Sequence, residues 1–515
     1  MTVLPLRNFL LRKIFQKQSF CISIILGYTR VLSYFESHLM GPINKGIHCH
    51  HQKITMQITD FLEDFSMSEI NHNQPSRGLS QDGLERTMTF FPALSTVMGT
   101  VIGAGVFFKA ASVASATGST SLHLFVWLLA GLISLCAGLT GAELAAAIPE
   151  TGGMIRYIER AYGKFPGFLL GWAQVIIYFP ANIAALAIIF ATQVKNLLVL
   201  SPITILPIAI LTTLSLTLIN FLGAKASGRM QSITLVAKLI PIGAIIIFGL
   251  LADTNVHVNL LPIEAGAKTG GLVTALGSGL LATMFAYDGW IHVGNIAGEL
   301  KNPARDLPKA IGFGMLGIMI VYGLINFAYL KAMPLAQLAG NDAAAMQVAQ
   351  YYFGSMGGKI ITIGILVSVY GTINGYTMTG MRLPYTLALE NLLPFSKQLS
   401  KLNQHKVPHI AGWLQAIIAI IMICLGGFNI LSDMLIFVIW IFYTLVFIAV
   451  IRLRKKEPNL HRPYKVPFYP IIPSIAIIGG IFILLLTLKS QFILALVGIL
   501  LTALGIPVYL YKQKK

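Results

Sequence analysis

The sequence predicts an all-α membrane protein with about twelve transmembrane helices. Of its 515 residues, 56% are hydrophobic and only 11% are charged. A soluble domain carries roughly a quarter charged residues, so this deficit points to lipid as the solvent. Several uninterrupted apolar stretches reach about 20 residues, the length that crosses a bilayer as a helix.

The spans follow from apolar runs interrupted by glycine, proline and charged residues. They are expected near 90–116, 122–148, 166–194, 203–223, 230–252, 271–297, 308–331, 357–381, 408–427, 431–451, 471–488 and 491–511.

The formal net charge of +18 raises the question of nucleic acid binding. The positive residues lie in short loops between the spans, and no basic stripe interleaved with aromatics occurs, so no nucleic acid partner is expected. Twelve spans place both termini on one side, and most lysines and arginines of the loops fall on that side. The positive-inside rule makes it cytoplasmic. We expect a multi-pass protein of a cell membrane with both termini in the cytoplasm.

Residues 1–66 do not fit this pattern. They form a poorly patterned extension, and the preferred interpretation is an over-long start, with the true start at Met56 or Met67. The alternative is a disordered tail. The histidines and cysteine at 48–51 lack paired zinc-site spacing, and no CxxC occurs, so neither a metal site nor a cofactor is expected.

Two spans contain a break near their centre, at 99–107 in the first span and at 285–290 in the sixth. Unwound backbone is tolerated in a membrane only where it lines a cavity. Freed N–H groups at a half-helix N-terminus suit a carboxylate, and freed carbonyls suit an ammonium group. The pair therefore predicts a receptor for a zwitterion. Close helix packing around glycines is the alternative.

Breaks in spans one and six are typical of proteins built from two inverted repeats of five helices. The expected organisation is the extension 1–66, a cytoplasmic tail 67–88, a first repeat 89–252 (spans one to five), a second repeat 271–452 (spans six to ten) and the last two spans in 470–511.

Four ordered motifs carry a resemblance to a known family. They are VIGAGVF at 101–107, GAELA at 141–145 with IPETGG at 148–153, FAYDGW at 285–290 with GELKNP at 298–303, and RPYKVP at 462–467. Together they resemble the amino acid–polyamine–organocation superfamily of permeases. The run YGTINGY at 370–376, continued by RLPY at 382–385, is similar to the bacterial L-type transporters, which include serine/threonine exchangers.

The resemblance implies a LeuT-type fold with substrate held between spans one and six. The implied carboxylate cradle is Ile102, Gly103, Ala104 and Gly105, and the implied carbonyls or neighbours of the amine are Val101, Phe285, Ala286 and Asp288. Phe285 is also the implied aromatic gate. A second possible role for the side chain of Asp288 is to cap the broken helix. The loop at 195–202 lacks the cysteine that joins animal relatives to an accessory chain, so no heavy-chain subunit is expected.

Lys238 is the most informative single charge. It follows Arg229 by nine residues, roughly 13.5 Å along a helix, which places it near mid-membrane. Such a lysine faces the bundle interior and indicates a substrate or ion pathway or a proton relay. The resemblance implies an ammonium that replaces the sodium ion of related carriers between spans one and eight. Two roles stay open, a fixed tether and a coupling group that exchanges a proton.

Other polar residues of the spans carry simpler expectations. Glu143, Glu299 and Arg382 fall near cytoplasmic ends, where loop salt bridges or an inner gate are expected. His123 and His292 lie near span ends and are expected to be interfacial.

The expected function is secondary active transport of amino acids by alternating access. Neutral L-amino acids are favoured over di-cations, because Asp288 is the only acidic candidate near the breaks. The resemblance implies serine and threonine or larger neutral amino acids. Sodium-independent exchange and proton coupling both stay open. A cationic amino-acid or polyamine permease is the alternative, and a channel is disfavoured. No GxxxxGK[ST], HExxH or GxSxG motif occurs, so an enzyme is not expected.

Overall fold

Every regular element among the described residues is a helix, and one isolated bridge joins Met88 to Leu300. The computed structural model describes residues 86–150, 152–252, 258–267, 269–341 and 343–513, which belong to one compact unit, Arg77–Lys515. The predicted extension 1–66, both candidate starts and most of the tail 67–88 lie outside the described residues.

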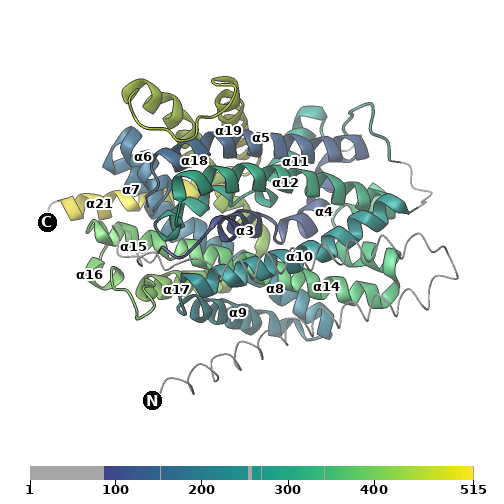
Figure 1. Ribbon diagram of the computed structural model, residues 1–515. Coiled ribbons are helices and arrows are strands. Elements are labelled where there is room, and N and C mark those ends of the chain that lie inside the picture. Colours follow the sequence, from purple (N-terminus) through teal and green to yellow (C-terminus); the bar gives the residue numbers. More distant parts are fainter. Residues whose placement is uncertain (1–85, 151, 253–257, 268, 342, 514–515) are drawn as a thin grey trace, which may run out of the picture. The chain divides into compact units, whose positions relative to one another are not determined.

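The helices of the first five spans follow one another without long interruptions (Figure 1). They are α3 (Phe90–Val101), α4 (Gly105–Thr117), α5 (Thr120–Ala147), α6 (Met154–Tyr162), α7 (Lys164–Ala173), the π-helical turn η1 (Gln174–Tyr178), α8 (Phe179–Leu198), the 3₁₀ turn η2 (Pro202–Thr204), α9 (Ile205–Asn220) and α10 (Ala224–Leu251).

The remaining spans and their connecting helices begin after a loop. They are α11 (Leu272–Ala286), the 3₁₀ segment η3 (Trp290–Glu299), α12 (Pro303–Ala332), α13 (Leu335–Leu338), α14 (Ala344–Gly380), α15 (Arg382–Leu389), α16 (Ser396–Leu399), α17 (His409–Leu425), α18 (Phe428–Lys456), α19 (Ile471–Ser490), α20 (Phe492–Ala503) and α21 (Gly505–Gln513).

Ten helical segments of the described chain are long and apolar enough to cross a membrane. The other two expected spans are present in a different form: α17 has 17 residues, and the sixth span is divided into α11 and η3. The structure therefore confirms an all-α membrane protein with about twelve transmembrane helices. The inverted relation between the two repeats stays a prediction.

The eighth span is longer than predicted. The sequence indicated 357–381, whereas α14 begins at Ala344. The additional turns precede Gly354, whose φ of 71° lies in the left-handed region that favours glycine and marks a kink between two helical pieces. The glycine at 354 therefore bends the eighth span and does not mark its beginning.

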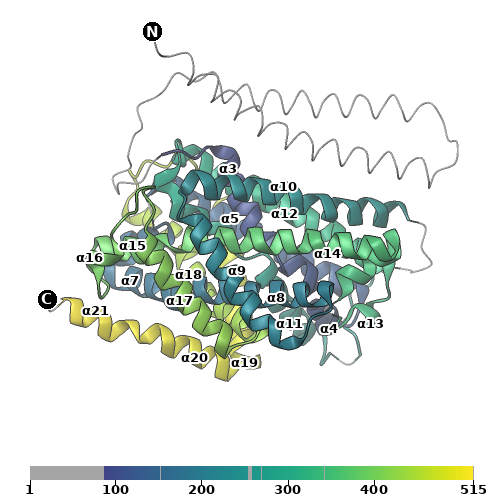
Figure 2. The same cartoon turned by 90° about the horizontal axis from the view of Figure 1, so that it is seen from below.

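Burial separates central from peripheral spans. In the first span 72% of the most apolar stretch is buried and in α18 78%, against 28% in the fourth span and 22% in the last. The first half-helix, α3, packs against α10, α12, α14 and η3. Figure 2 shows α20 and α21 along one edge of the described bundle. The first span and α18 are therefore central in the bundle, and the fourth and the last spans are peripheral.

An acidic residue at the end of α5 ties three segments together. Glu143 is fully buried and accepts hydrogen bonds from Arg454 on α18 at 2.5 and 2.9 Å. Arg462 lies 3.3 Å from the same carboxylate, and the backbone N–H of Val466 donates to it at 2.8 Å. Nearby, burial and then the Glu143 charge raise the pKa of Tyr464 to about 12, so its phenol is neutral. The loop pairing expected for Glu143 is thus observed.

Replacing Glu143 with alanine should destabilise the protein strongly. The change leaves two guanidinium groups partly buried without a counter-ion, a loss of about 3–5 kcal/mol for a buried pair. The matched control is Glu457→Ala, because Glu457 pairs with Arg160 at 2.7 Å on the exposed face, where its pKa is lowered chiefly by that hydrogen bond. Such pairs contribute about 0–1 kcal/mol. Thermal unfolding in detergent should show the larger fall in Tm for Glu143→Ala, and equal falls would contradict the argument.

Candidate functional site

The two helix breaks meet in the centre of the bundle. The first separates α3 from α4 and leaves Ile102, Gly103 and Ala104 between them, all buried. The second separates α11 from η3 at residues 287–289. A Cβ added to Gly105 would lie 2.5 Å from the Cα of Ala286, closer than real contacts allow. Only glycine at 105 lets the two backbones approach this closely, so the two predicted breaks lie side by side.

The first break exposes backbone donors. Ile102 has extended backbone angles (φ −74°, ψ 90°), while its N–H still bonds to the carbonyl of Met98 at 2.8 Å. The new helix starts at Gly105, and the N–H groups of a helix's first turn have no acceptor within the helix. The partial positive charge of that turn favours an anion. The start of α4 therefore suits an anion, whereas the N–H of Ile102 is already bound to Met98. The carboxylate cradle stays a prediction.

The carbonyls beside the breaks are bridged by a tyrosine that the sequence analysis did not identify. The hydroxyl of Tyr322 on α12 lies 2.9 Å from the carbonyl oxygen of Val101 and 3.0 Å from that of Ala286. These residues end α3 and α11. The single hydroxyl proton of Tyr322 is shared between these two carbonyl oxygens, which the resemblance implied as acceptors for the ammonium group of the substrate.

Lys238 occupies the other side of the first break. Its side chain is fully buried, and Nζ donates to the carbonyls of Gly99 at 2.9 Å and Ile102 at 2.5 Å. The third donor reaches the hydroxyl of Thr372 on α14 at 3.1 Å. An ammonium group has three N–H donors, and each has an acceptor here. The ammonium thus connects the backbone of the first break to the eighth span.

Asp288 sits in the sixth break among tyrosines. The carboxylate is 3% exposed and accepts hydrogen bonds from Tyr178 and, at 2.8 Å, from Tyr443. Tyr376 lies 3.4 Å away. These rings come from η1, α18 and α14, so the side chain of Asp288 faces other spans. Neither of its expected roles is tested by this arrangement.

Glycine is required beside Asp288 as well. Gly289 has a φ of 109°, and a Cβ there would meet the Tyr376 hydroxyl at 2.9 Å and Thr100 at 3.2 Å. The π-helical turn that carries Tyr178 lies opposite; such turns occur frequently at functional sites. Mid-span tyrosines would have been the sequence signal for this cluster, but tyrosine in a membrane protein is more typical of the interface.

A group that we call the aromatic closure covers one end of the site. Phe285 is 7% exposed and packs edge-on against Phe428, with ring centroids 5.4 Å apart. The Nζ of Lys109 lies 5.3 and 5.2 Å from these two rings. The same Nζ is 3.5 Å from Asp433 and 3.3 Å from Ser432. The predicted gate residue is thus held by a buried cation from α4.

A second group, the ion-pair closure, covers the opposite end. Arg382 lies 2.5 Å from Glu299, and both side chains are 2% exposed. The backbone of Met88 pairs there with that of Glu299 and Lys301, at 2.9 Å in each case. A salt bridge was one of the two roles expected for Glu299 and Arg382, and their role as an inner gate stays a prediction. With both closures formed, the breaks are enclosed on two sides.

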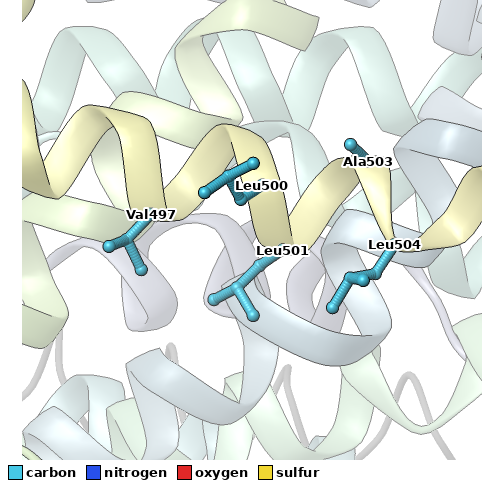
Figure 3. A pocket seen from close by; sticks show the side chains of 5 residues that line it. All are labelled: Val497, Leu500, Leu501, Ala503 and Leu504. Carbon is cyan, nitrogen blue, oxygen red and sulfur yellow. The ribbon is translucent and has the colours of Figure 1, made fainter.

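A surface pocket lies elsewhere. It is lined by Val497, Leu500, Leu501, Ala503 and Leu504, all on or just after the peripheral helix α20 (Figure 3). Its walls are apolar, as expected of a surface that faces lipid chains. It has no polar group that could orient a zwitterion, so it is not a candidate for the transport site.

The prediction for the two span-end histidines is wrong. His123 and His292 are fully buried, at 0% and 1% exposure. His123 pairs with Asn326 at 3.1 Å, and His292 with the hydroxyl of Tyr443 at 3.1 Å. The break shortens the sixth span, and the following 3₁₀ segment folds into the bundle, which draws His292 inward.

Comparison with known proteins identifies the family. A family model described as "Amino acid permease" matches residues 88–502. The chain is 39% identical over 436 residues to the serine/threonine exchanger SteT of Bacillus subtilis, covering 84% of this chain and 98% of that protein. It is 28% identical over 441 residues to the human cystine/glutamate transporter, with 85% and 87% covered. The mouse Asc-type amino acid transporter 1 is 29% identical over 439 residues, with 83% and 81% covered.

These matches span most of the chain and agree with the four motifs, with the membrane-spanning helices and with the two joined breaks. They confirm the resemblance to the amino acid–polyamine–organocation superfamily. The chain belongs to the amino acid permease family, and is a multi-pass membrane transporter of amino acids rather than an enzyme.

Proposed function

We propose that this chain exchanges neutral L-amino acids, serine and threonine foremost, across a bacterial cell membrane. The observation that carries the proposal is the contact of the two breaks, in which Gly105 faces Ala286. One surface thereby offers backbone donors from α4 and backbone acceptors from α11. That pairing matches the carboxylate and ammonium groups common to all amino acids. The similarity to a serine/threonine exchanger supports the choice of substrate.

Substrate would bind with its carboxylate in the cradle of Ile102, Gly103, Ala104 and Gly105, on the N–H groups at 103–105, because the N–H of Ile102 is bound to Met98. Its ammonium would lie near the carbonyls of Val101, Phe285, Ala286 and Asp288. The Tyr322 hydroxyl holds two of these carbonyls together in the structure. An ammonium has three donors where the hydroxyl has one, so it can satisfy both carbonyls and further acceptors at once. Phe285 would then cover the bound substrate as part of the aromatic closure.

Lys238 is best explained as a fixed cation. All three of its donors have acceptors, two on the first break and one on the eighth span. Losing a proton would leave one acceptor without its donor in a buried place, which costs free energy. We therefore propose that Lys238 replaces a sodium ion and keeps the first break in shape. Transport is then independent of sodium.

The proposed cycle is alternating access. Spans one, two, six and seven would rock against the others, so that the aromatic closure and the ion-pair closure open in turn. Both closures are formed in the structure, which fits an occluded state of such a cycle. The termini are proposed to be cytoplasmic on the strength of the loop charges, and no accessory subunit is proposed, because the 195–202 loop lacks a cysteine.

A cationic amino-acid or polyamine permease is the second candidate. Asp288 favours it, because this buried carboxylate has hydroxyl partners and forms no ion pair within the part of the chain that the structure describes. A cationic side chain would supply the missing charge. The site has one such acid, whereas a di-cation would be expected to need more.

Exchange in proteoliposomes distinguishes these candidates. Vesicles preloaded with unlabelled serine should take up labelled serine at least about ten-fold faster than empty vesicles, since an exchanger returns only when loaded. Replacing sodium with potassium should change nothing. Threonine should compete, and lysine and putrescine should not. Competition by lysine or putrescine alone would support the second candidate, and no uptake of any of them would refute the transport of neutral amino acids.

Gly105→Ala tests the contact of the two breaks directly. The added Cβ would collide with the backbone of Ala286, so serine exchange should fall at least about ten-fold, the loss of a well-positioned binding group. Gly243→Ala is the matched control, because no atom lies within 4 Å of a Cβ at Gly243 in the mid-span of α10. Its exchange rate should stay within about two-fold of the wild type. Equal rates in both variants would refute the proposed site.

Lys238→Ala tests the fixed cation. Removing the ammonium leaves the carbonyls of Gly99 and Ile102 without their donor, so exchange should fall at least about ten-fold. Sodium ions should restore part of it by occupying the same carbonyls. Lys331→Ala is the control, because Lys331 also donates to a backbone carbonyl, that of Ala252 at 2.6 Å, but at a helix end. Wild-type rates for Lys238→Ala would contradict the tether.

A further inference from the structure

Among the described residues, the buried side chain of Asp288 has hydroxyl partners and no ion-pair partner. Tyr178 and Tyr443 donate to it, and Tyr376 lies at 3.4 Å. Burying a carboxylate is costly unless it is paired or fully hydrogen-bonded. Three phenol groups from three other spans satisfy it in place of a cation.

The cationic side chains near Asp288 each bind another group. Lys238 is bound to the first break and Lys109 to Asp433, while Arg382 pairs with Glu299. The titratable groups near the sixth break include Tyr178 on η1, Tyr376 on α14, Tyr443 on α18, His292 on η3, Tyr322 on α12, Tyr287 after α11 and Lys238 on α10. On α5, which also packs against α11 and η3, His123 is bound to Asn326 and Glu143 to Arg454. The hydroxyl of Tyr287 is bound to the carbonyl of Trp127 at 3.0 Å, so it turns away from Asp288.

A hydrogen-bond chain leads from Asp288 to His292. The Nε2 of His292 lies 3.1 Å from the Tyr443 hydroxyl, which lies 2.8 Å from Asp288. The Nδ1 of His292 has no hydrogen-bond partner within the described residues, although the ring is 1% exposed. The ring is also fixed in place, with its centroid 4.5 Å from that of Tyr178 and 4.9 Å from that of Phe179. With its proton on Nε2, His292 donates to Tyr443 and Tyr443 donates to Asp288.

We propose that Asp288 is a proton-binding site of this transporter, loaded through His292 and Tyr443. A proton arriving at Nδ1 of His292 moves the Nε2 proton to the oxygen of Tyr443, whose own proton passes to Oδ1 of Asp288. One proton enters and one O–H bond forms on Asp288. Tyr443 ends unchanged, and His292 ends neutral with its proton on Nδ1.

Protonation would loosen the sixth span. Asp288 and His292 lie on that span, whereas Tyr178, Tyr376 and Tyr443 lie on spans three, eight and ten, the proposed static part. Hydrogen bonds to a carboxylate are roughly twice as strong as those between neutral groups. A charged Asp288 therefore holds the moving span against the static one, and a neutral Asp288 releases it. This inference rests on the proposed alternating access and adds the proton to it as a second ligand.

The test is serine exchange in preloaded proteoliposomes with the same pH on both sides. The pH is varied from about 5.5 to about 8.5, a range that includes the ordinary pKa of histidine. The wild-type rate should fall at least about ten-fold as the pH rises, because the charged form is the locked one. Asp288→Asn, which resembles the protonated acid, should show less than about two-fold change over this range.

Two further variants separate the relay from general damage. Tyr443→Phe removes one donor to the carboxylate and the link to His292, so the midpoint of the rate profile should move to higher pH. Tyr329→Phe is the control, because Tyr329 on α12 is buried and its hydroxyl has no partner within the described residues. Its profile should match the wild type.

An infrared difference spectrum between the two pH limits provides a readout that needs no transport. Purified wild-type protein should show the carbonyl band of a protonated carboxylic acid at the lower pH, and Asp288→Asn should lack it. A band that persists in Asp288→Asn, or a pH profile that this variant leaves unchanged, would overturn the proton site. Wild-type protein that shows the band but exchanges no serine would instead refute the proposed function.

Discussion

The structure depends on one constraint: backbone polar groups that leave a helix inside a membrane need partners. Two spans break in the middle of this bundle, and each break is supported by side chains from other spans. Lys238 and Thr372 hold the carbonyls of the first break, and Tyr322 bridges the carbonyls of both. The buried polar residues of α10, α12 and α14 thus supply hydrogen-bond partners to the backbone of both breaks, and the proposed zwitterion site lies where the breaks meet.

The two breaks are supported in different ways, and this difference has mechanical consequences. The first is bound by Lys238, whose three donors all have acceptors on the first break or on α14. The sixth is bound through a carboxylate and tyrosine hydroxyls. In the roles proposed above, Lys238 keeps its proton and supports the backbone of the first break, whereas Asp288 binds and releases one and holds the sixth break only while it is charged. The proposal thus places a constant support and an adjustable one beside the same candidate site.

The sequence was sufficient for the approximate positions of the spans, for both breaks and for the burial of Lys238, because each is a local signal: an apolar run, a glycine cluster or a charge within a span. It missed Tyr178, Tyr322, Tyr376 and Tyr443, since their role arises only when distant spans meet. It also misplaced His292, which looks interfacial by position along the chain. The position of a residue along its helix follows from the local sequence, but the residue that it contacts on another helix does not. Every residue that was missed makes its contacts with other helices.

The closures at the two ends follow from a similar argument about charge. An apolar plug between Phe285 and Phe428 alone would gain free energy in proportion to the area it buries, and opening it would lose all of that. A buried ion pair differs, because the cost of desolvation roughly cancels its attraction. When water enters beside Lys109 and Asp433, or beside Glu299 and Arg382, both partners recover their hydration as they separate. Closures built on ion pairs therefore exclude water while closed and open at a small net cost, which suits a carrier whose two ends have to open in every cycle.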